Sequence, residues 1–509
     1  MKKHLALLAT AFALVFFAAV TARAATFIQK SAGTYDWTNT ANWLDGIAPA
    51  ATETTRVYFP HHRPASGGEP RTVELNRSNQ VLQGGLDLAY GNGGIADSTG
   101  EAGLTLDLTT YTLKIDGSSV QCFNNFDNAG QVGIPTVTIT NGTFQLGDNN
   151  AASITIGSRL IRRAELYFTS SATLDSKNVS SVYIAAGGDT RFYNYNPTWD
   201  LSDATLKSGT TSNALVIGDD LNIGLSSTDN YYTSTTRSGS LLLPSSIEVL
   251  SVGQDLILGQ TTGSSHQSVG TIDFGGSASL DLSIARNLYL GYGGEGTANL
   301  TNMPDDMDLT VGSDTVRGGN IYIGYKDRVT YNAGLSQYAQ GDLTTPGGTV
   351  NAWVQDVSIG RNTADTSGLT GEAGTPGASG TLDLSASTLG TLDASGGIYV
   401  GVGENATGVM RLSGGTVTAD SVTVGDSDSG SGELELLGTD VSIASSLTVG
   451  DGDLISIVMD GASGGIDLAF SEAGTLDISG TIDVDFANAL ADFVWSVRMP
   501  GDHETLFNS

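Results

Sequence analysis

The sequence predicts an all-β fold, a right-handed parallel β-helix, and three observations lead to this prediction. A four-residue phrase, apolar–any–apolar–Gly, returns along the chain. A second phrase, Gly followed by alternating polar and apolar residues, accompanies it. Both phrases have the period of a strand with one buried face, and few segments show the three-and-four spacing of a helix. Self-similarity at a period of roughly 20 to 50 residues is typical of stacked repeats.

The first phrase sets the size of one coil. From Gly224 onward its glycines are 35, 32, 33, 36, 41, 24 and 25 residues apart. The shortest interval makes a turn about 80 Å around at roughly 3.3 Å per residue, which encloses a narrow core. Longer intervals indicate inserted loops, such as residues 361–379. The copies are Ile154–Gly157, Leu221–Gly224, Leu256–Gly259, Leu288–Gly291, Ile321–Gly324, Val357–Gly360, Ile398–Gly401, Val422–Gly425 and Leu447–Gly450.

The second phrase is clearest at Gly270–Gly276, Gly380–Leu384, Gly408–Gly415, Gly432–Leu436 and Gly480–Val484. Identical phrases are expected to stack as parallel strands whose alternate side chains fill the interior. A series of small β-sandwiches is the rival architecture. It predicts antiparallel hairpins with turn signals about every 8–12 residues.

The chain begins with the three-part pattern of a secretory signal. Lys2 and Lys3 form the basic start, Leu5–Val20 the apolar stretch, and Ala22–Ala24 the small-residue cleavage site. The apolar stretch is shorter than the roughly 20 residues of a membrane span. We therefore expect residues 1–24 to be removed on export, which leaves no transmembrane segment.

The exported part divides into three segments. Residues 25–80 are aromatic-rich and not repetitive, and they are predicted to form an N-terminal cap whose core holds Trp37 and Trp43. Residues 81–480 carry the repeats. Residues 481–509 leave the pattern and are predicted to form a short C-terminal cap. A solenoid needs such caps because an open end leaves apolar core and strand edges bare.

The charge and the cysteine content limit which partners and which compartment the sequence suits. The chain has 54 acidic and 23 basic residues and a formal net charge of −31. This balance excludes nucleic acid and anionic lipid as partners, since both require basic patches. It suits a solvated extracellular surface that attracts divalent cations. The single Cys122 cannot form an internal disulfide and is expected to be a small buried apolar group.

Three segments resemble a known family. Gly408–Val417, followed by Val422–Gly425, resembles the autotransporter-associated β-strand repeat. Residues 35–49, with a Trp, an Asn-Trp pair, a Gly and a Pro, are similar to the start of large bacterial exported proteins, and Gly501–Phe507 is similar to the closing strand of such passengers. The resemblance implies a β-helix secreted by a bacterium or displayed on its outer surface. Such proteins often continue into a barrel or a Pro-Glu-Pro sorting tail, so we expect a chain truncated before its anchor, or a released protein.

Tyrosines recur at the middle position of the first phrase, at Tyr183, Tyr289, Tyr322 and Tyr399. In a solenoid these side chains point outward, about 4.8 Å apart where their coils are adjacent. A row of exposed rings can stack sugar rings, which makes Tyr289, Tyr322 and Tyr399 candidate glycan-binding residues. Ladder stabilisation is the simpler interpretation, worth under about 1 kcal/mol per pair.

Acidic turns suggest a second kind of site. Asp426 and Asp428 lie in one turn, and Asp451 and Asp453 in the next copy. Carboxylates in Asp-x-Asp turns supply oxygen ligands for calcium, the cofactor that these four residues would suit. The sequence lacks the rest of a calcium-loop signature, so solvated turn residues are the simpler interpretation.

Catalytic residues are not assigned. Polysaccharide lyases and pectinases use this fold, with carboxylates or a basic residue on one face, but no local cluster here combines acid, base and orienting group. The possible contributors are Asp273, Asp383, Asp483, Arg286, Lys326, Arg328 and Arg361. We therefore expect a structural or adhesive surface protein without catalytic activity, whose partners are polysaccharide or other surface proteins. The alternatives are a secreted carbohydrate-active enzyme and a glycan-binding module.

Overall fold

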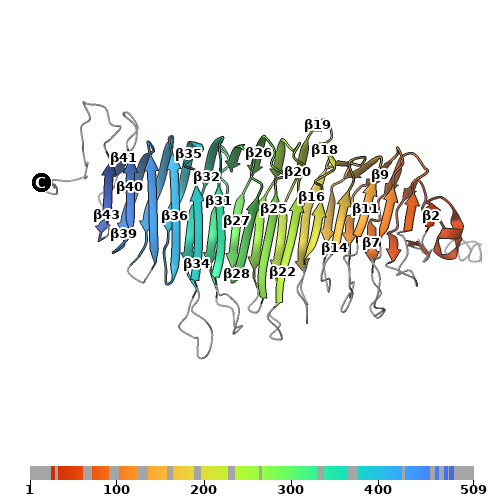
Figure 1. The fold of residues 1–509 in the computed structure, drawn as a ribbon, viewed down its shortest axis with the longest axis horizontal. Helices are drawn as coiled ribbons and strands as arrows, with labels where there is room; N and C mark the ends of the chain where they lie inside the picture. The colour runs from red at the N-terminus through yellow and green to blue at the C-terminus, as the bar shows by residue number, and fades with distance from the viewer. Residues whose placement is uncertain are drawn as a thin grey trace, which may run out of the picture.

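The computed structural model describes residues 24–28, 33–60, 71–90, 103–123, 136–157, 164–187, 196–226, 235–262, 266–328, 338–364, 377–426, 430–458, 465–468, 475–479 and 481–485. Nearly all of this chain is strand, wound into an elongated parallel β-helix (Figure 1). Strands of successive coils lie side by side along the long axis, from the red N-terminal end to the blue C-terminal end. The signal, up to residue 23, and the C-terminal residues 486–509 lie outside the described residues.

Each coil passes through three faces, which we number in chain order. Face 1 consists of β1 (Ala25–Thr26), β4 (Val57–Pro60), β7 (Leu86–Tyr90), β10 (Ser119–Cys122), β13 (Ala152–Ile156), β16 (Val179–Gly187), β21 (Leu221–Ser226), β24 (Asp255–Thr261), β27 (Asn287–Gly293), β30 (Asn320–Lys326), β33 (Asp356–Asn362) and β42 (Thr475–Ile478).

Face 2 is one ladder of fifteen strands. They are β2 (Gly33–Asp36), β5 (Arg71–Glu74), β8 (Leu104–Asp107), β11 (Thr136–Thr140), β14 (Ala164–Phe168), β17 (Pro197–Asp200), β22 (Thr235–Leu242), β25 (His266–Asp273), β28 (Glu295–Thr301), β31 (Tyr338–Thr344), β34 (Gly377–Asp383), β36 (Ala406–Ser413), β38 (Ser431–Leu437), β40 (Leu454–Val458) and β43 (Thr481–Asp485).

Face 3 has two stretches and joins face 1 near the C-terminal end. Long strands run round that corner: β35 (Thr388–Val400), β37 (Thr416–Val424) and β39 (Asp440–Val449). The strands of face 3 are β3 (Thr52–Glu53), β6 (Gln80–Leu82), β9 (Thr112–Ile115), β12 (Thr143–Leu146), β15 (Thr173–Asp175), β18 (Thr205–Ser208) with its hairpin partner β19 (Thr211–Ser212), then β20 (Ala214–Ile217), β23 (Val249–Val252), β26 (Ser279–Ile284), β29 (Asp306–Val311), β32 (Thr349–Val354) and β41 (Gly465–Leu468).

The repeated phrases lie on one another in register. Leu256 pairs with Leu288, and Leu288 pairs with Ile321, in parallel ladders. Among the described strands, β18 and β19 form the one antiparallel pair. The predicted parallel β-helix is therefore confirmed, and the β-sandwich rival, which requires antiparallel hairpins, is wrong.

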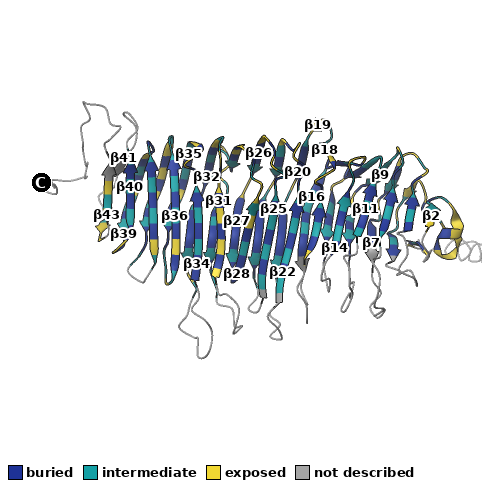
Figure 2. Cartoon of the chain, in the orientation of Figure 1, coloured by how far each residue is buried: buried dark blue, intermediate teal, exposed yellow. Residues whose placement is uncertain are grey.

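Alternation along each strand builds the core. Leu288 and Leu290 are buried inside the coil, while Tyr289 between them is only partly buried and faces outward. Figure 2 shows buried and less buried residues alternating along the strands. Burying such a leucine contributes roughly 1.5–3 kcal/mol relative to leaving it in water. The buried apolar residues form one continuous core along the helix. Cys122 belongs to it, as predicted, and burial raises the pKa of its thiol well above the ordinary value.

Two rows of glycine meet where face 1 turns into face 2, and we call them the glycine seam. Gly324 has a left-handed φ of +61°, and a Cβ placed there would lie 1.9 Å from the carbonyl oxygen of Ser379 in the next coil. A Cβ on Gly380 would lie 2.4 Å from the backbone nitrogen of Gly360. No other residue type fits these contacts. The seam comprises Gly224, Gly259, Gly291, Gly324, Gly360, Gly401 and Gly425 of the first phrase and Gly270, Gly341, Gly380, Gly408 and Gly432 of the second.

Aromatic rings fill the N-terminal end of the coil. Trp37 and Trp43 are buried, as predicted, and their ring centroids lie 5.4 Å apart. The Trp43 indole Nε1 donates a hydrogen bond to the carbonyl of Trp37 at 2.8 Å. Two 3-10 turns, η1 (Thr40–Asn42) and η2 (Leu44–Gly46), belong to this end (Figure 1).

The coils begin earlier than the expected boundary at residue 81. Strand β1 already pairs with β4, and β2 with β5, in the same parallel register as later coils. Residues 25–80 therefore combine an aromatic plug with the first coils. Their sequence hides the repeat because Trp and Phe occupy interior positions that Leu, Ile and Val fill elsewhere.

The seam makes a direct prediction about stability. Gly324→Ala is expected to lower the free energy of unfolding by more than about 3 kcal/mol, because it adds a backbone clash to a strained φ. Gly276→Ala is the matched control, since Gly276 has a φ of +65° but open space around its Cβ position. That control is expected to cost only about 1–2 kcal/mol. Urea unfolding followed by circular dichroism measures both, and equal losses would contradict the close approach.

Candidate functional site: a tyrosine strip on face 1

Four tyrosines gather on the outside of β27 and β30. Each strand contributes two, Tyr289 and Tyr292 from β27 and Tyr322 and Tyr325 from β30. The seam glycine between the members of each pair interrupts the alternation, so that both tyrosines of a strand point outward. Register then places Tyr322 beside Tyr289, and Tyr325 beside Tyr292.

The four rings form an offset stack, which we call the tyrosine strip. The centroids of Tyr289 and Tyr322 lie 5.3 Å apart, and those of Tyr292 and Tyr325 lie 5.6 Å apart with an interplanar angle of 8°. Within each strand the separations are 4.9 Å for Tyr289–Tyr292 and 4.4 Å for Tyr322–Tyr325. Offset stacks of this kind contribute about 0.5–1.5 kcal/mol per pair beyond the buried area. Each ring is half-buried and leaves part of its surface in solvent.

The structure brings together only part of the predicted column. Tyr322 pairs with Ser358 in the next coil, and Ser358 pairs with Tyr399 in the one after. The gap is bridged by Arg361, whose guanidinium carbon lies 3.6 Å from the centroid of the Tyr399 ring. Tyr183 stands apart, three coils away from Tyr289.

Sequence reasoning missed Tyr292 and Tyr325. The signal was present, because both lie directly after the phrase glycine in Tyr289–Tyr292 and Tyr322–Tyr325. Strict alternation would place Tyr292, two residues after the buried Leu290, inside the coil. The glycine between them breaks the alternation, so Tyr292 points outward. The sequence also offered Arg361 for a catalytic role, whereas the structure places it over an aromatic ring.

Hydroxyl groups of the strip differ in their partners. The Tyr292 hydroxyl donates to a carboxylate oxygen of Asp327 at 3.0 Å, and the Tyr325 hydroxyl lies 3.2 Å from the hydroxyl of Thr363. No described residue forms a hydrogen bond with the Tyr322 hydroxyl. Burial raises the pKa of Tyr292 and of Tyr322 above the ordinary value, so both are neutral phenols at neutral pH.

A buried lysine lies directly beside the strip. Lys326 follows Tyr325, points inward, and is fully buried. Its Nζ donates a hydrogen bond to the carbonyl of Gly294 at 2.5 Å. Burial lowers the Lys326 pKa to about 8, with the nearby Glu295 and Asp327 carboxylates opposing the shift. Lys326 therefore serves the interior of the coil and does not reach the outer surface.

The acidic turns are bound into the backbone of the last coils. Asp426 accepts a hydrogen bond from the Gly403 backbone N–H at 2.7 Å, and Asp453 accepts one from that of Gly432 at 2.7 Å. Burial raises the pKa of Asp453, and the neighbouring Asp426 and Asp451 add to the shift. Asp428 lies outside the described residues. Within the part of the chain that the structure describes, no three His, Cys, Asp or Glu side chains form a group suited to a metal ion.

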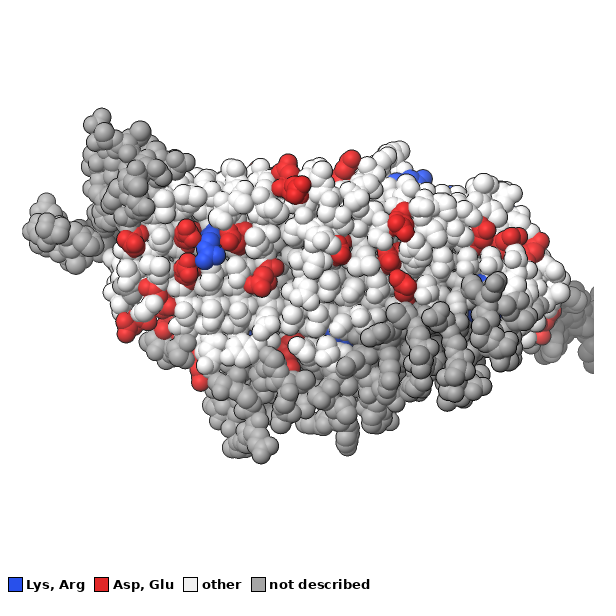
Figure 3. All heavy atoms as spheres, viewed as in Figure 1, with Lys and Arg blue, Asp and Glu red and all other residues white. Residues whose placement is uncertain are grey.

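The side chains considered for catalysis form structural pairs. Asp383 meets Arg411 at 3.4 Å, and Arg411 also meets Glu435 at 3.0 Å in the following coil. Asp273 accepts a hydrogen bond from the amide of Asn302 at 2.9 Å. Figure 3 shows carboxylates scattered over one face of the molecule with few cationic groups among them.

Other candidates are paired as well. Arg286 forms a salt bridge with Asp255 at 2.5 Å, and Arg328 forms one with Asp327 at 2.7 Å. These arginines therefore pair with a carboxylate of the neighbouring coil or of the same turn. Asp483 lies in the last described strand, and its side chain forms no salt bridge or hydrogen bond with a described residue.

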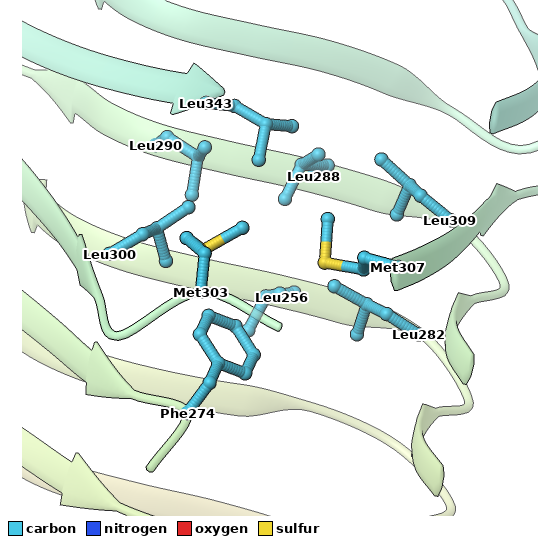
Figure 4. A pocket seen from close by; sticks show the side chains of 10 residues that line it. All are labelled: Leu256, Phe274, Leu282, Leu288, Leu290, Leu300, Met303, Met307, Leu309 and Leu343. Carbon is cyan, nitrogen blue, oxygen red and sulfur yellow. The ribbon is translucent and has the colours of Figure 1, made fainter. Parts of the chain in front are cut away.

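Two gaps in the described interior are too small for a ligand. One of about 20 Å³ lies between the fourth and fifth copies of the first phrase. The other, of about 10 Å³, lies between the third and fourth copies and has a volume near that of one water molecule. Figure 4 shows that Leu and Met side chains and one Phe line it, from strands on all three faces. Binding therefore falls to the outer faces.

No protein-family model, curated protein sequence or solved structure matches this chain. The autotransporter-associated resemblance therefore stays a prediction. Among the described residues, no helix has the length and apolar character needed to cross a membrane.

The buried lysine gives stability a pH dependence. Below pH 8 Lys326 is protonated in the folded and the unfolded states. Between pH 8 and about 10.5 the unfolded chain binds the proton and the folded chain does not, so stability rises with pH. Relative to Lys326→Met, the native protein is expected to gain on the order of 3 kcal/mol at most across this window. Urea unfolding midpoints of both proteins, taken at a series of pH values, measure the difference. Tyrosine ionisation affects both proteins alike and therefore cancels in the comparison. Parallel pH profiles of the two proteins would contradict the lowered pKa of Lys326.

Proposed function

We propose that this protein is an exported structural and adhesive β-helix without catalytic activity, and that it holds its partner on an outer face. The observation that carries the proposal is the tyrosine strip, a stack of four half-buried rings on the outside of the β-helix. Aromatic groups with a polar tip are favoured where a protein meets another surface, because they offer large contact area at low entropy cost.

Two further features support an adhesive role. Described charged side chains pair across coils, as in the Asp383–Arg411–Glu435 series, instead of converging on one site. Interior gaps of about 10 and 20 Å³ are too small for a substrate. A catalytic centre needs an acid, a base and an orienting group at one place. The described residues bring no such set together around the strip.

A glycan-binding module is the second candidate, and the strip favours it over the enzyme alternative. Two successive coils repeat Tyr289 and Tyr322 at the strand spacing, so an extended polymer lying along the helix axis would meet two similar ring pairs in succession. A bacterial surface protein that adheres through such a strip would encounter polysaccharide first.

The test is retention of residues 25–509 on immobilised polysaccharides, together with assay of the eluate for new reducing ends or unsaturated sugars. We expect retention without turnover. Tyr289→Ala combined with Tyr322→Ala is expected to weaken binding roughly thirtyfold, since stacked rings contribute about 1 kcal/mol each.

Tyr183→Ala is the matched control, because Tyr183 occupies the same strand position three coils away from the strip. It is expected to bind like the native protein. Equal weakening by both variants would show that the strip is not the binding surface. New sugar products would overturn the proposal that the protein is not catalytic.

A further inference from the structure

Arg361 is unusual among the cationic side chains of this acidic protein. Eight described lysines and arginines form salt bridges with carboxylates, Arg286 and Arg411 among them. Arg361 forms none with any described residue. Its only described hydrogen bond is a weak one, from Nη1 to the Ser358 hydroxyl at 3.5 Å. In a chain with 54 acidic and 23 basic residues, an arginine without a salt bridge to a described carboxylate has donors left for an acceptor from outside.

The position of Arg361 is fixed by its neighbours. It follows the seam glycine Gly360 on β33, pairs in register with Tyr325, and lies over the ring of Tyr399 at 3.6 Å. A guanidinium over an aromatic face is held by cation–π attraction of about 0.5–1 kcal/mol at exposed sites. Its Nε is buried without an acceptor in the described chain, so the Nη groups carry the donors that remain.

A second donor with no described partner lies beside it. The Tyr322 hydroxyl forms no hydrogen bond with a described residue, whereas the hydroxyls of Tyr292 and Tyr325 each meet a partner. Arg361 Nη1 lies 3.5 Å from the Ser358 hydroxyl, and Ser358 pairs in register with Tyr322, so the guanidinium lies one strand away from Tyr322. The guanidinium offers donors only and the phenol hydroxyl can donate as well, which favours an acceptor-rich, anionic group.

Nearby carboxylates are already bound. Asp356 accepts a hydrogen bond from the Gly397 backbone N–H at 2.8 Å, and Asp327 is shared between Arg328 and the Tyr292 hydroxyl. More distant carboxylates are screened, because the Debye length is about 8 Å at physiological ionic strength. The negative net charge therefore does not exclude an anionic ligand at this position.

We propose that the Arg361 guanidinium and the Tyr322 hydroxyl form a subsite for the carboxylate of a uronic acid, so that the tyrosine strip binds an acidic polysaccharide. The inference rests on the proposed adhesive function and specifies its ligand. A polysaccharide fits better than a peptide because the strip presents two similar pairs of stacked rings one strand spacing apart. The carboxylate takes the donors, and the sugar ring lies against the tyrosine edges.

The experiment measures binding of the full chain to polygalacturonate, to a neutral dextran and to dextran sulfate. We expect the native protein to prefer polygalacturonate, with affinity that falls as salt rises. Arg361→Gln is expected to reduce that affinity about tenfold or more, and Arg361→Lys to restore part of it, since lysine keeps the charge but not the planar fork.

Tyr322→Phe and Tyr183→Phe form the matched pair, because each removes one hydroxyl and keeps the ring, and Tyr183 lies outside the strip. Tyr322→Phe is expected to weaken binding to polygalacturonate, and Tyr183→Phe to leave it unchanged. Urea unfolding verifies that all variants are folded. Equal affinity of Arg361→Gln and native protein for polygalacturonate overturns the subsite, and so does a native preference for dextran sulfate or for neutral dextran.

Failure of the subsite and failure of the adhesive function give different results. If the native protein and Arg361→Gln are retained equally on polygalacturonate, the adhesive function stands and the carboxylate subsite is wrong. If the native protein is retained on none of the three polymers, both the subsite and glycan adhesion through the strip are wrong.

Discussion

The glycine seam is the constraint on which the rest of this structure depends. At the corner between faces 1 and 2 the backbone of one coil approaches that of the next so closely that a Cβ would overlap a carbonyl oxygen, as at Gly324 and Ser379. The same glycines adopt a left-handed φ that lets the strand turn sharply. Because this corner recurs once per coil at one place, it fixes the register of every face, and register decides which side chains meet on the outside.

The tyrosine strip is a consequence of that register. Tyr289 and Tyr322 meet because Leu288 and Ile321 are paired inside the coil, and Tyr292 and Tyr325 join them because the seam glycine resets the alternation. The same break in alternation after the seam glycine directs Arg361 outward in the next coil, where its guanidinium lies over the ring of Tyr399. A structural device of the backbone thus assembles an aromatic and cationic surface from residues far apart in the sequence.

Much of the fold could be predicted from the sequence, because period-2 alternation and phrase glycines directly encode strand faces and corners. The coils inside residues 25–80 could not, since Trp37 and Trp43 replace the aliphatic residues that mark other coils. The outward column at Tyr289 and Tyr322 was predictable from position alone. Tyr292, Tyr325 and the role of Arg361 were not, because they depend on how a left-handed glycine shifts the residues that follow it and on contacts between coils.

In-register stacking of parallel coils is the central claim, and cross-linking at register positions tests it most directly. Thr423 and Thr448 are partners on β37 and β39, whereas Thr423 and Ser446 are offset by two residues. Cysteines at 423 and 448, in a chain with Cys122→Ser, are expected to oxidise to a disulfide, since neighbouring strands hold Cα atoms about 4.8 Å apart. Cysteines at 423 and 446 are expected to stay reduced. A disulfide in the offset pair and none in the register pair would contradict the account.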